Sequence, residues 1–211
     1  MTRTRFVSRV VKPLLVVAGG APVAWLAVSA VTGGLGANPI DRITDETGTW
    51  TLRLLLASLA VTPLRRVTGW NDLIKVRRML GLFAFFYGAL HVSTYVVLDQ
   101  FFDPASIFGD IVKRPFITAG VTGFVLMVPL AVTSTAGWIR RLGGRRWQQL
   151  HRLAYASAAA GVVHYYWLVK ADVSRPLRYA AVLAVLLLAR LVWSRTRAVS
   201  RRSAVPGTTA T

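Results

Sequence analysis

The sequence predicts an all-α membrane protein: a polytopic helical bundle with six transmembrane helices and both termini in the cytoplasm. Three observations predict this fold class. Apolar side chains make up 54% of the 211 residues and the mean hydropathy is +0.50, which is too apolar for an ordinary soluble domain. The apolar residues form long runs rather than the three-in-seven pattern of surface helices. Short basic clusters separate these runs, which is where membrane proteins place their positive charge.

Six apolar segments are predicted to cross the membrane, because about twenty helical residues at ~1.5 Å each span a hydrocarbon core about 30 Å thick. The first carries no charge, although a cleaved signal peptide is an alternative, since residues 28–30 resemble a small-residue cleavage site. The third lacks Asp, Glu, Lys and Arg, and the fourth is long, with a kink expected at Pro129. The six segments are residues 14–31, 49–64, 79–98, 115–139, 147–169 and 177–193.

The remaining three segments are less uniform. The second is short and contains Arg53 near its start. The fifth contains His151, Arg152 and His164, and the sixth is apolar apart from one arginine near each end. The second and sixth segments are only just long enough to cross the hydrocarbon core.

Charge sets the orientation. With the N-terminus in the cytoplasm, 19 of the 26 basic residues fall on the cytoplasmic side, whereas the other side holds the remaining seven and seven of the eight acids. This pattern obeys the positive-inside rule at every turn of the chain. The cytoplasmic set is Arg3, Arg5, Arg9, Lys12, Arg65, Arg66, Lys75, Arg77, Arg78, Arg140, Arg141, Arg145, Arg146, Arg152, Arg190, Arg195, Arg197, Arg201 and Arg202.

The domain organisation follows directly. Residues 1–13 are predicted to be a basic cytoplasmic N-terminus, residues 14–193 the six-helix transmembrane domain, and residues 194–211 a basic, disordered cytoplasmic tail. The net charge of +18 could suggest nucleic acid, but its distribution favours membrane lipid instead. The absence of cysteine excludes disulfides, iron–sulfur clusters, thiolate-ligated haem and c-type haem attachment. No loop leaves room for a separate catalytic domain, and no catalytic residue is predicted.

All three histidines lie inside predicted spans, where an ionisable side chain usually has a function. Two imidazoles facing each other across a bundle can hold a haem iron from both sides. Counted along the helices from Arg78 and Arg146, His91 lies about 20 Å deep, His164 about 27 Å and His151 about 8 Å. The depths favour His91 with His164 as the ligand pair, in the outer half of the bilayer, because helix tilt can absorb the difference.

His151 is predicted near the cytoplasmic surface, at a depth similar to that of Arg77 and Arg78. Thirteen residues separate it from His164, so the two do not share one face of an ideal helix. A second haem would then lie at a different azimuth or use a ligand other than histidine. Each imidazole could instead be a core group bonded to a neighbouring hydroxyl. Arg77, Arg78 or Arg152 could pair with haem propionates or with a quinone or flavin head group.

Three stretches carry a resemblance to a known family: SLAVTPLRR (58–66), VRRMLGLFAFFYGALHVSTYVVLD (76–99) and RRWQQLHRLAYASAAAGVVHYYWLVKAD (145–172). Together they resemble the haem-binding membrane subunits, MsrQ, of bacterial protein-methionine-sulfoxide reductase systems, within the ferric-reductase-like transmembrane family. The resemblance covers nearly the whole chain. One departure from the eukaryotic oxidases of that family is that Arg77 and Arg78 stand where an inner ligand on the third helix would be.

The resemblance implies one or two b-type haems held by His91, His151 and His164, together with an associated FMN. It also implies a bacterial inner-membrane location and a periplasmic, molybdopterin-containing MsrP-like reductase as partner. Electrons would come from the quinone pool or a cytoplasmic flavin reductase. We therefore expect an electron-transfer subunit rather than the catalytic subunit. A stand-alone ferric or quinone reductase of the same fold, and a haem-free transporter or assembly factor, are the alternatives.

Overall fold

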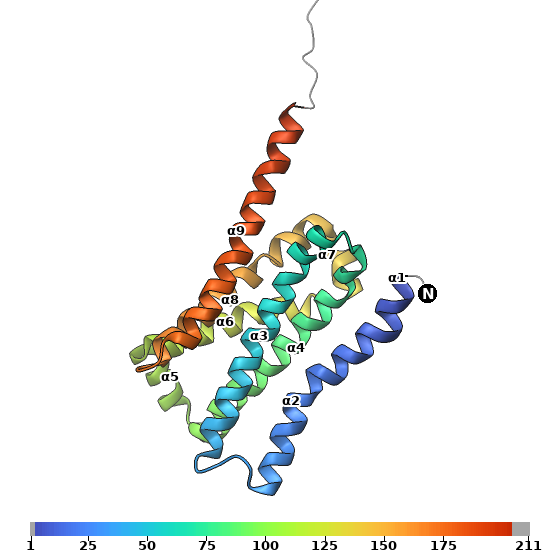
Figure 1. Cartoon of the computed structure of the whole chain (residues 1–211). Coiled ribbons are helices and arrows are strands. Elements are labelled where there is room, and N and C mark those ends of the chain that lie inside the picture. The colour runs from blue at the N-terminus through green and yellow to red at the C-terminus, as the bar shows by residue number, and fades with distance from the viewer. Residues whose placement is uncertain (1–2, 204–211) are drawn as a thin grey trace, which may run out of the picture.

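The computed structural model describes residues 3–203, and every regular element in that range is a helix. Figure 1 shows the long helices arranged as a bundle. The long helices are α2 (Lys12–Thr32), α3 (Pro39–Thr68), α4 (Ile74–Ser93), α6 (Pro115–Val132), α8 (Leu153–Leu168) and α9 (Ser174–Ser203). The shorter ones are α1 (Arg3–Phe6), α5 (Pro104–Lys113) and α7 (Ala136–Leu150). Val7–Val11 and Thr94–Asp99 are π-helical, and Asn71–Leu73 is a 3₁₀ turn.

Local sequence explains where the helices begin and end. The side chains of Asn38, Asp103 and Thr135 accept backbone N–H bonds at the starts of α3, α5 and α7, as short polar N-cap residues do. Gly33 and Gly69 end α2 and α3 with φ of 74° and 67°, a left-handed conformation that glycine adopts without a Cβ clash. The chain therefore turns sharply between successive long helices.

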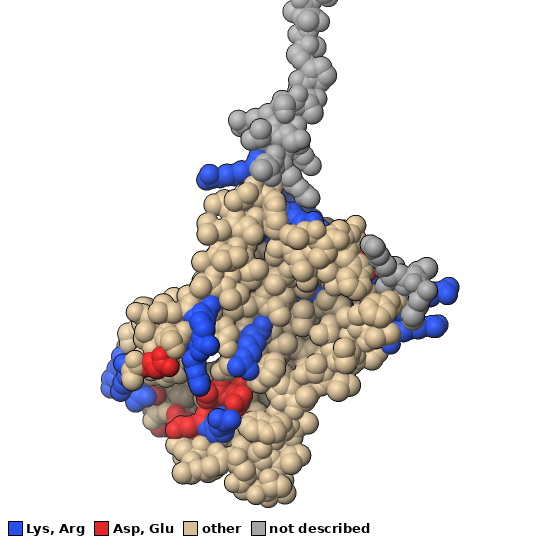
Figure 2. All heavy atoms as spheres, viewed as in Figure 1, with Lys and Arg blue, Asp and Glu red and all other residues tan. Residues whose placement is uncertain are grey.

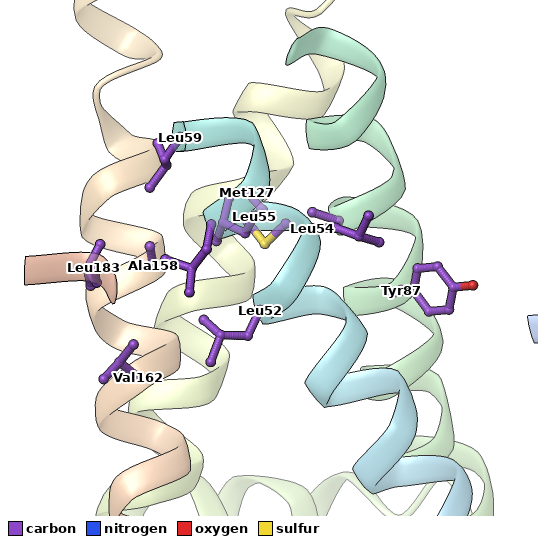
Figure 3. Close-up of a cluster of buried hydrophobic side chains, with 11 residues drawn as sticks. Leu52, Leu54, Leu55, Leu59, Tyr87, Met127, Ala158, Val162 and Leu183 are labelled. Carbon is purple, nitrogen blue, oxygen red and sulfur yellow. The ribbon is translucent and has the colours of Figure 1, made fainter. Parts of the chain in front are cut away.

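The closest packed pairs are α3 with α4 and α6 with α8. Small residues allow the second pair to approach: the Ser157 hydroxyl donates to the Gly123 carbonyl at 2.8 Å, and a Cβ on Gly123 would lie 3.4 Å from that of Ala160. Figure 3 shows the apolar core between these four helices, with Leu183 reaching it from α9.

Helix α2 lies along the outside of the bundle (Figure 1), where a buried side chain of α4 hydrogen-bonds to its backbone. The Tyr87 hydroxyl on α4 donates to the Gly19 carbonyl at 2.6 Å and accepts from the Val23 amide at 3.1 Å. Tyr87 is fully buried, and its ring points toward α2 in Figure 3. A hydroxyl thus bridges two backbone groups of α2 that stand one helical turn apart.

The beginning of α1 and the described end of α9 lie at the same end of the bundle as α7, opposite α5 (Figure 1). On the face shown in Figure 2, the acidic side chains gather toward the α5 end. Four helical stretches are long and apolar enough to cross a membrane: Val7–Thr32, Asn71–Asp99, Pro115–Val132 and Ser174–Trp193. Helices α3 and α8 do not meet those criteria by themselves, so the number six remains a prediction.

The structure corrects three predicted boundaries. The fourth segment, 115–139, is not one helix, because α6 ends at Val132 and α7 begins at Ala136. The fifth, 147–169, is broken, because α7 ends at Leu150 and α8 begins at Leu153. The tail is not wholly disordered, because α9 continues to Ser203; residues 204–211 lie outside the described residues.

Two short amphipathic helices were not predicted. Helix α7 carries four arginines and two tryptophans and changes direction at Gly143 (φ 72°, ψ 151°). Helix α5 follows Phe101 and Phe102, two exposed residues with φ of 48° and 59°. The Ser106 hydroxyl and the Ala105 amide bond Asp103 at the start of α5, and these bonds lower the pKa of its carboxyl. Both helices have the composition of interfacial elements.

Candidate functional site

The structure brings His91 on α4 and His164 on α8 together. Their ring centroids lie 6.0 Å apart, with ring planes at 80°. The depth counted for His164 began at Arg146, which lies in α7 rather than in α8, so the two counted depths do not share a common origin.

Each imidazole is oriented by a backbone carbonyl of a neighbouring helix. His91 Nδ1 bonds the Thr44 carbonyl of α3 at 2.9 Å, and His164 Nδ1 bonds the Phe116 carbonyl of α6 at 2.6 Å. Because a carbonyl oxygen can only accept, each Nδ1 carries the proton and each Nε2 keeps its lone pair. This is the tautomer and outer-shell bond that metal-ligating histidines characteristically have.

A glycine makes room for each ring. A Cβ on Gly48 would lie 3.0 Å from His91 Cε1 and Nδ1, and one on Gly120 would lie 2.7 Å from His164 Nδ1. Both glycines stand four residues after the carbonyl that holds the imidazole, Thr44 in one case and Phe116 in the other. The same construction therefore occurs twice, once on α3 and once on α6.

The separation of the two rings suits a metal ion held between them. Imidazole nitrogens bind metal ions at about 2.0–2.1 Å, so two rings that share one ion have centroids about 6 Å apart, as those of His91 and His164 do. Among the described residues, no group of three or more His, Cys, Asp or Glu could hold a bare metal ion. A haem would need only these two histidines from the protein.

His151 belongs to a different environment. It lies in the turn between α7 and α8, not inside a spanning helix as predicted, so the azimuth argument from an unbroken helix does not apply. Its Nε2 lies 3.1 Å from the Thr133 hydroxyl, and its ring stacks on Trp147 with centroids 3.9 Å apart. The structure therefore keeps His151 away from the pair and gives it a hydroxyl partner.

The three candidate arginines also differ. Arg77 is half-buried and its Nη1 donates to the Thr62 hydroxyl on α3 at 3.2 Å. Arg78 and Arg152 are exposed. Arg190 on α9, which was not a candidate, donates to the Tyr155 hydroxyl on α8.

Several acidic side chains lie on helices. Asp41, Asp45 and Glu46 lie in the first turns of α3, where Arg42 pairs with Glu46 at 3.2 Å. Asp110 lies in α5, where it accepts from Arg114 at 3.0 Å and from the Tyr95 hydroxyl at 3.0 Å. Acids near a helix N-terminus are stabilised by the helix dipole, which explains why this polar stretch extends α3 beyond its apolar run.

The most informative residues that the sequence reading missed are backbone partners and glycines. Nothing in a side-chain pattern marks the carbonyls of Thr44 and Phe116. The glycines gave a usable signal, because Gly48 and Gly120 each lie inside a helix and glycine there costs about 1 kcal/mol relative to alanine. A helix that retains such a glycine commonly has a close neighbour at that point.

Comparison with known proteins identifies the family of the chain. A family model described as the ferric reductase like transmembrane component matches residues 47–162, the stretch that holds α4, α6 and most of α3 and α8. The protein-methionine-sulfoxide reductase heme-binding subunit MsrQ of Herminiimonas arsenicoxydans is 50% identical over 200 residues, 94% of this chain and 91% of that protein. The subunit of the same name from Rhodospirillum rubrum is 55% identical over 171 residues, 81% and 82% of the two chains. That of Caulobacter vibrioides is 52% identical over 183 residues, 87% of each.

Proposed function

This chain belongs to the MsrQ family of ferric reductase-like transmembrane components, and on that premise we propose that it is the haem-binding, electron-transfer subunit of a protein-methionine-sulfoxide reductase. The observation that carries the proposal is the His91–His164 pair, with centroids 6.0 Å apart and both Nδ1 atoms bonded to carbonyls. Catalysis on the sulfoxide belongs to another subunit.

His91 and His164 would hold one b-type haem. If bound there, that group would supply single-electron transfer. The residues of the chain orient the ligands: the carbonyls of Thr44 and Phe116 fix both rings and hold their Nδ1 protons. We propose that His151 binds or lies beside a second cofactor at the other end of the bundle. This cofactor would be either a second haem or an FMN.

We propose that α3 and α8 also cross the membrane, which makes six spans with α2, α4, α6 and α9. Both pack inside the bundle against helices that are apolar enough to span, and α3 carries much of the buried core. Since α1 and the end of α9 lie at one end with the basic clusters, the positive-inside rule places that end in the bacterial cytoplasm. The inner membrane is the corresponding location.

The position of the pair suggests the direction of electron flow. His91 is three residues from Thr94, where α4 gives way to its π-helical extension, so the pair lies toward the outer end of the bundle. A periplasmic molybdopterin reductase of the MsrP kind could dock there and receive electrons. The quinone pool or a cytoplasmic flavin reductase would supply them at the opposite end.

An optical spectrum of the purified protein tests the haem proposal. Dithionite-reduced protein from haem-replete cells should show low-spin b-type bands, and His91→Ala or His164→Ala should remove the part of them that comes from the haem held by this pair, which we call the outer haem. His151→Ala is the matched control, because its ring lies outside the pair, and it should keep the bands of the outer haem. Wild-type protein without haem, or full bands in both His91→Ala and His164→Ala, would contradict the proposal.

Partner dependence tests the electron acceptor. In membrane vesicles, reduced haem should be reoxidised by methionine-sulfoxide protein only when the periplasmic reductase is added. Reoxidation by ferric chelates or quinone at equal rates with and without that reductase would favour a stand-alone ferric or quinone reductase.

A further inference from the structure

Two arginines converge on one tyrosine at the end of the bundle opposite the His91–His164 pair. The Arg190 guanidinium of α9 donates to the Tyr155 hydroxyl, and its central carbon lies 4.4 Å from the Tyr155 ring centroid. Arg77 of α4 bonds Thr62 of α3 and also interacts with both Tyr155 and Arg190. Four helices, α3, α4, α8 and α9, thus contribute to one cluster, which we call the inner arginine cluster: Thr62, Arg77, Tyr155 and Arg190.

No ion pair found among the described residues joins Arg77 or Arg190 to a carboxylate. The pairs Arg42–Glu46, Lys75–Asp72 and Arg114–Asp110 involve other basic side chains. The sequence has no acid between Asp110 and Asp172 and none after Asp172, so helices α6 to α9 cannot supply one. The cluster therefore holds two like charges without a protein anion.

The two side chains do not simply reach out to the membrane surface. Lysine and arginine near helix ends often extend to the headgroups, which would explain exposed residues such as Arg78. Arg77 and Arg190 instead turn toward other helices, and both are half-buried. An ionisable side chain held between helices of a membrane protein is by default a candidate functional residue.

We propose that the inner arginine cluster binds the oxyanion tail of a planar redox cofactor seated at the inner end of the bundle. The shared chemistry is a phosphate or carboxylate held by two guanidinium groups, whose planar forks match such oxyanions, with the Tyr155 hydroxyl as a further donor. The source is either the phosphate of a flavin mononucleotide or the propionates of a second haem. His151, within electrostatic reach of Arg77, lies beside this site.

The inference rests on the proposed function only in assuming a second cofactor, and it is tested separately from the outer haem. Purified full-length protein would be titrated with FMN and, in parallel, with riboflavin, which lacks the phosphate, by flavin fluorescence quenching. Haem per protein would be counted in the same samples. The variants are Arg77→Gln, Arg190→Gln, Arg190→Lys and Tyr155→Phe, with Arg195→Gln, an exposed arginine on the same helix, as control.

If the tail is a flavin phosphate, wild-type protein should bind FMN at least tenfold more tightly than riboflavin, and Arg77→Gln and Arg190→Gln should abolish that preference. If it is a haem propionate, the same variants should lower haem per protein from about two to about one. In both cases Arg190→Lys should fall between wild type and Arg190→Gln, and Arg195→Gln should match wild type.

Unchanged FMN preference and unchanged haem count in both glutamine variants would overturn the inference. The bands of the outer haem serve as the folding control, and they should persist in every variant. If the outer-haem bands persist while FMN preference and haem count do not change, only the proposed inner site is refuted. If wild-type protein lacks the outer-haem bands, the proposed function is refuted instead.

Discussion

Gly120→Ala is the sharpest perturbation of the proposed haem site, because the new methyl group would lie 2.7 Å from His164 Nδ1 and 3.0 Å from Cε1. An ordinary carbon–nitrogen contact is about 3.5 Å, so the ring must move by roughly 0.8 Å. The His164 ring is held by its 2.6 Å hydrogen bond to the carbonyl of Phe116, which lies on α6, the same helix as Gly120. The methyl group and the bond cannot both be accommodated without a shift of α8.

The magnitude follows from the role of that bond. Loss of an outer-shell partner of a metal-ligating histidine typically weakens metal affinity or activity by 10–100-fold. The helix itself should not suffer, since replacing glycine by alanine in a helix interior favours the helix by up to about 1 kcal/mol. The variant is therefore expected to lose haem affinity while keeping its helical content.

The assay is the rate of haem transfer from purified protein to excess apomyoglobin, followed by the b-type absorbance bands. Gly120→Ala should release haem at least tenfold faster than wild type. Gly48→Ala should show a smaller effect, because its methyl group would lie 3.0 Å from the His91 ring. Gly81→Ala is the matched control, since nothing lies within 4 Å of a Cβ there and Gly81 is on the same helix as His91.

Two results would refute this reasoning. Equal haem release from Gly120→Ala and Gly81→Ala would mean that the glycine does not position His164. A larger effect in Gly48→Ala than in Gly120→Ala would reverse the order that the two distances require.

Two further predictions concern the fold. Tyr87→Phe removes the hydroxyl between the Gly19 carbonyl and the Val23 amide. It should lower the free energy of unfolding by about 1–2 kcal/mol, measured as a lower apparent melting temperature in detergent. An unchanged melting temperature would mean that the Val23 amide bonds the Gly19 carbonyl directly in the variant. Gly143→Ala places a residue with a Cβ at φ 72°, ψ 151°, and it should lower the free energy of unfolding by about 1–3 kcal/mol in the same measurement. Gly144→Ala should be neutral or stabilising, because a Cβ there meets open space and the residue does not have a positive φ.

The sequence predicted the helical bundle well because membrane spans leave a strong signal, long runs of apolar residues between basic clusters. Its errors lie in the short helix between two of the expected spans. Helix α7 joins Ala136 to Leu150 across residues that were divided between the fourth and fifth spans. A basic amphipathic stretch with tryptophans indicates an interfacial helix, and Thr135, which accepts from the Trp138 amide, marks its start.

The site was predictable only to the level of side chains. The matched positions of His91 and His164 on parallel segments pointed to a facing pair, and the structure brings the rings together. Their orientation depends on carbonyl oxygens, which every residue has, so no pattern of residue types reveals them. Arg190 was taken as a mark of orientation, because its contact with Tyr155 depends on how α9 packs against α8.

The three imidazoles differ in the nitrogen that forms their hydrogen bond. An unsatisfied polar atom in a buried position is costly, so the remaining nitrogen of each ring matters. His151 bonds a hydroxyl through Nε2 and stacks on Trp147. His91 and His164 bond carbonyls through Nδ1 alone, and within residues 3–203 no hydrogen bond to either Nε2 is found. Their rings lie with centroids 6.0 Å apart, and a metal ion bound between them would use both Nε2 lone pairs.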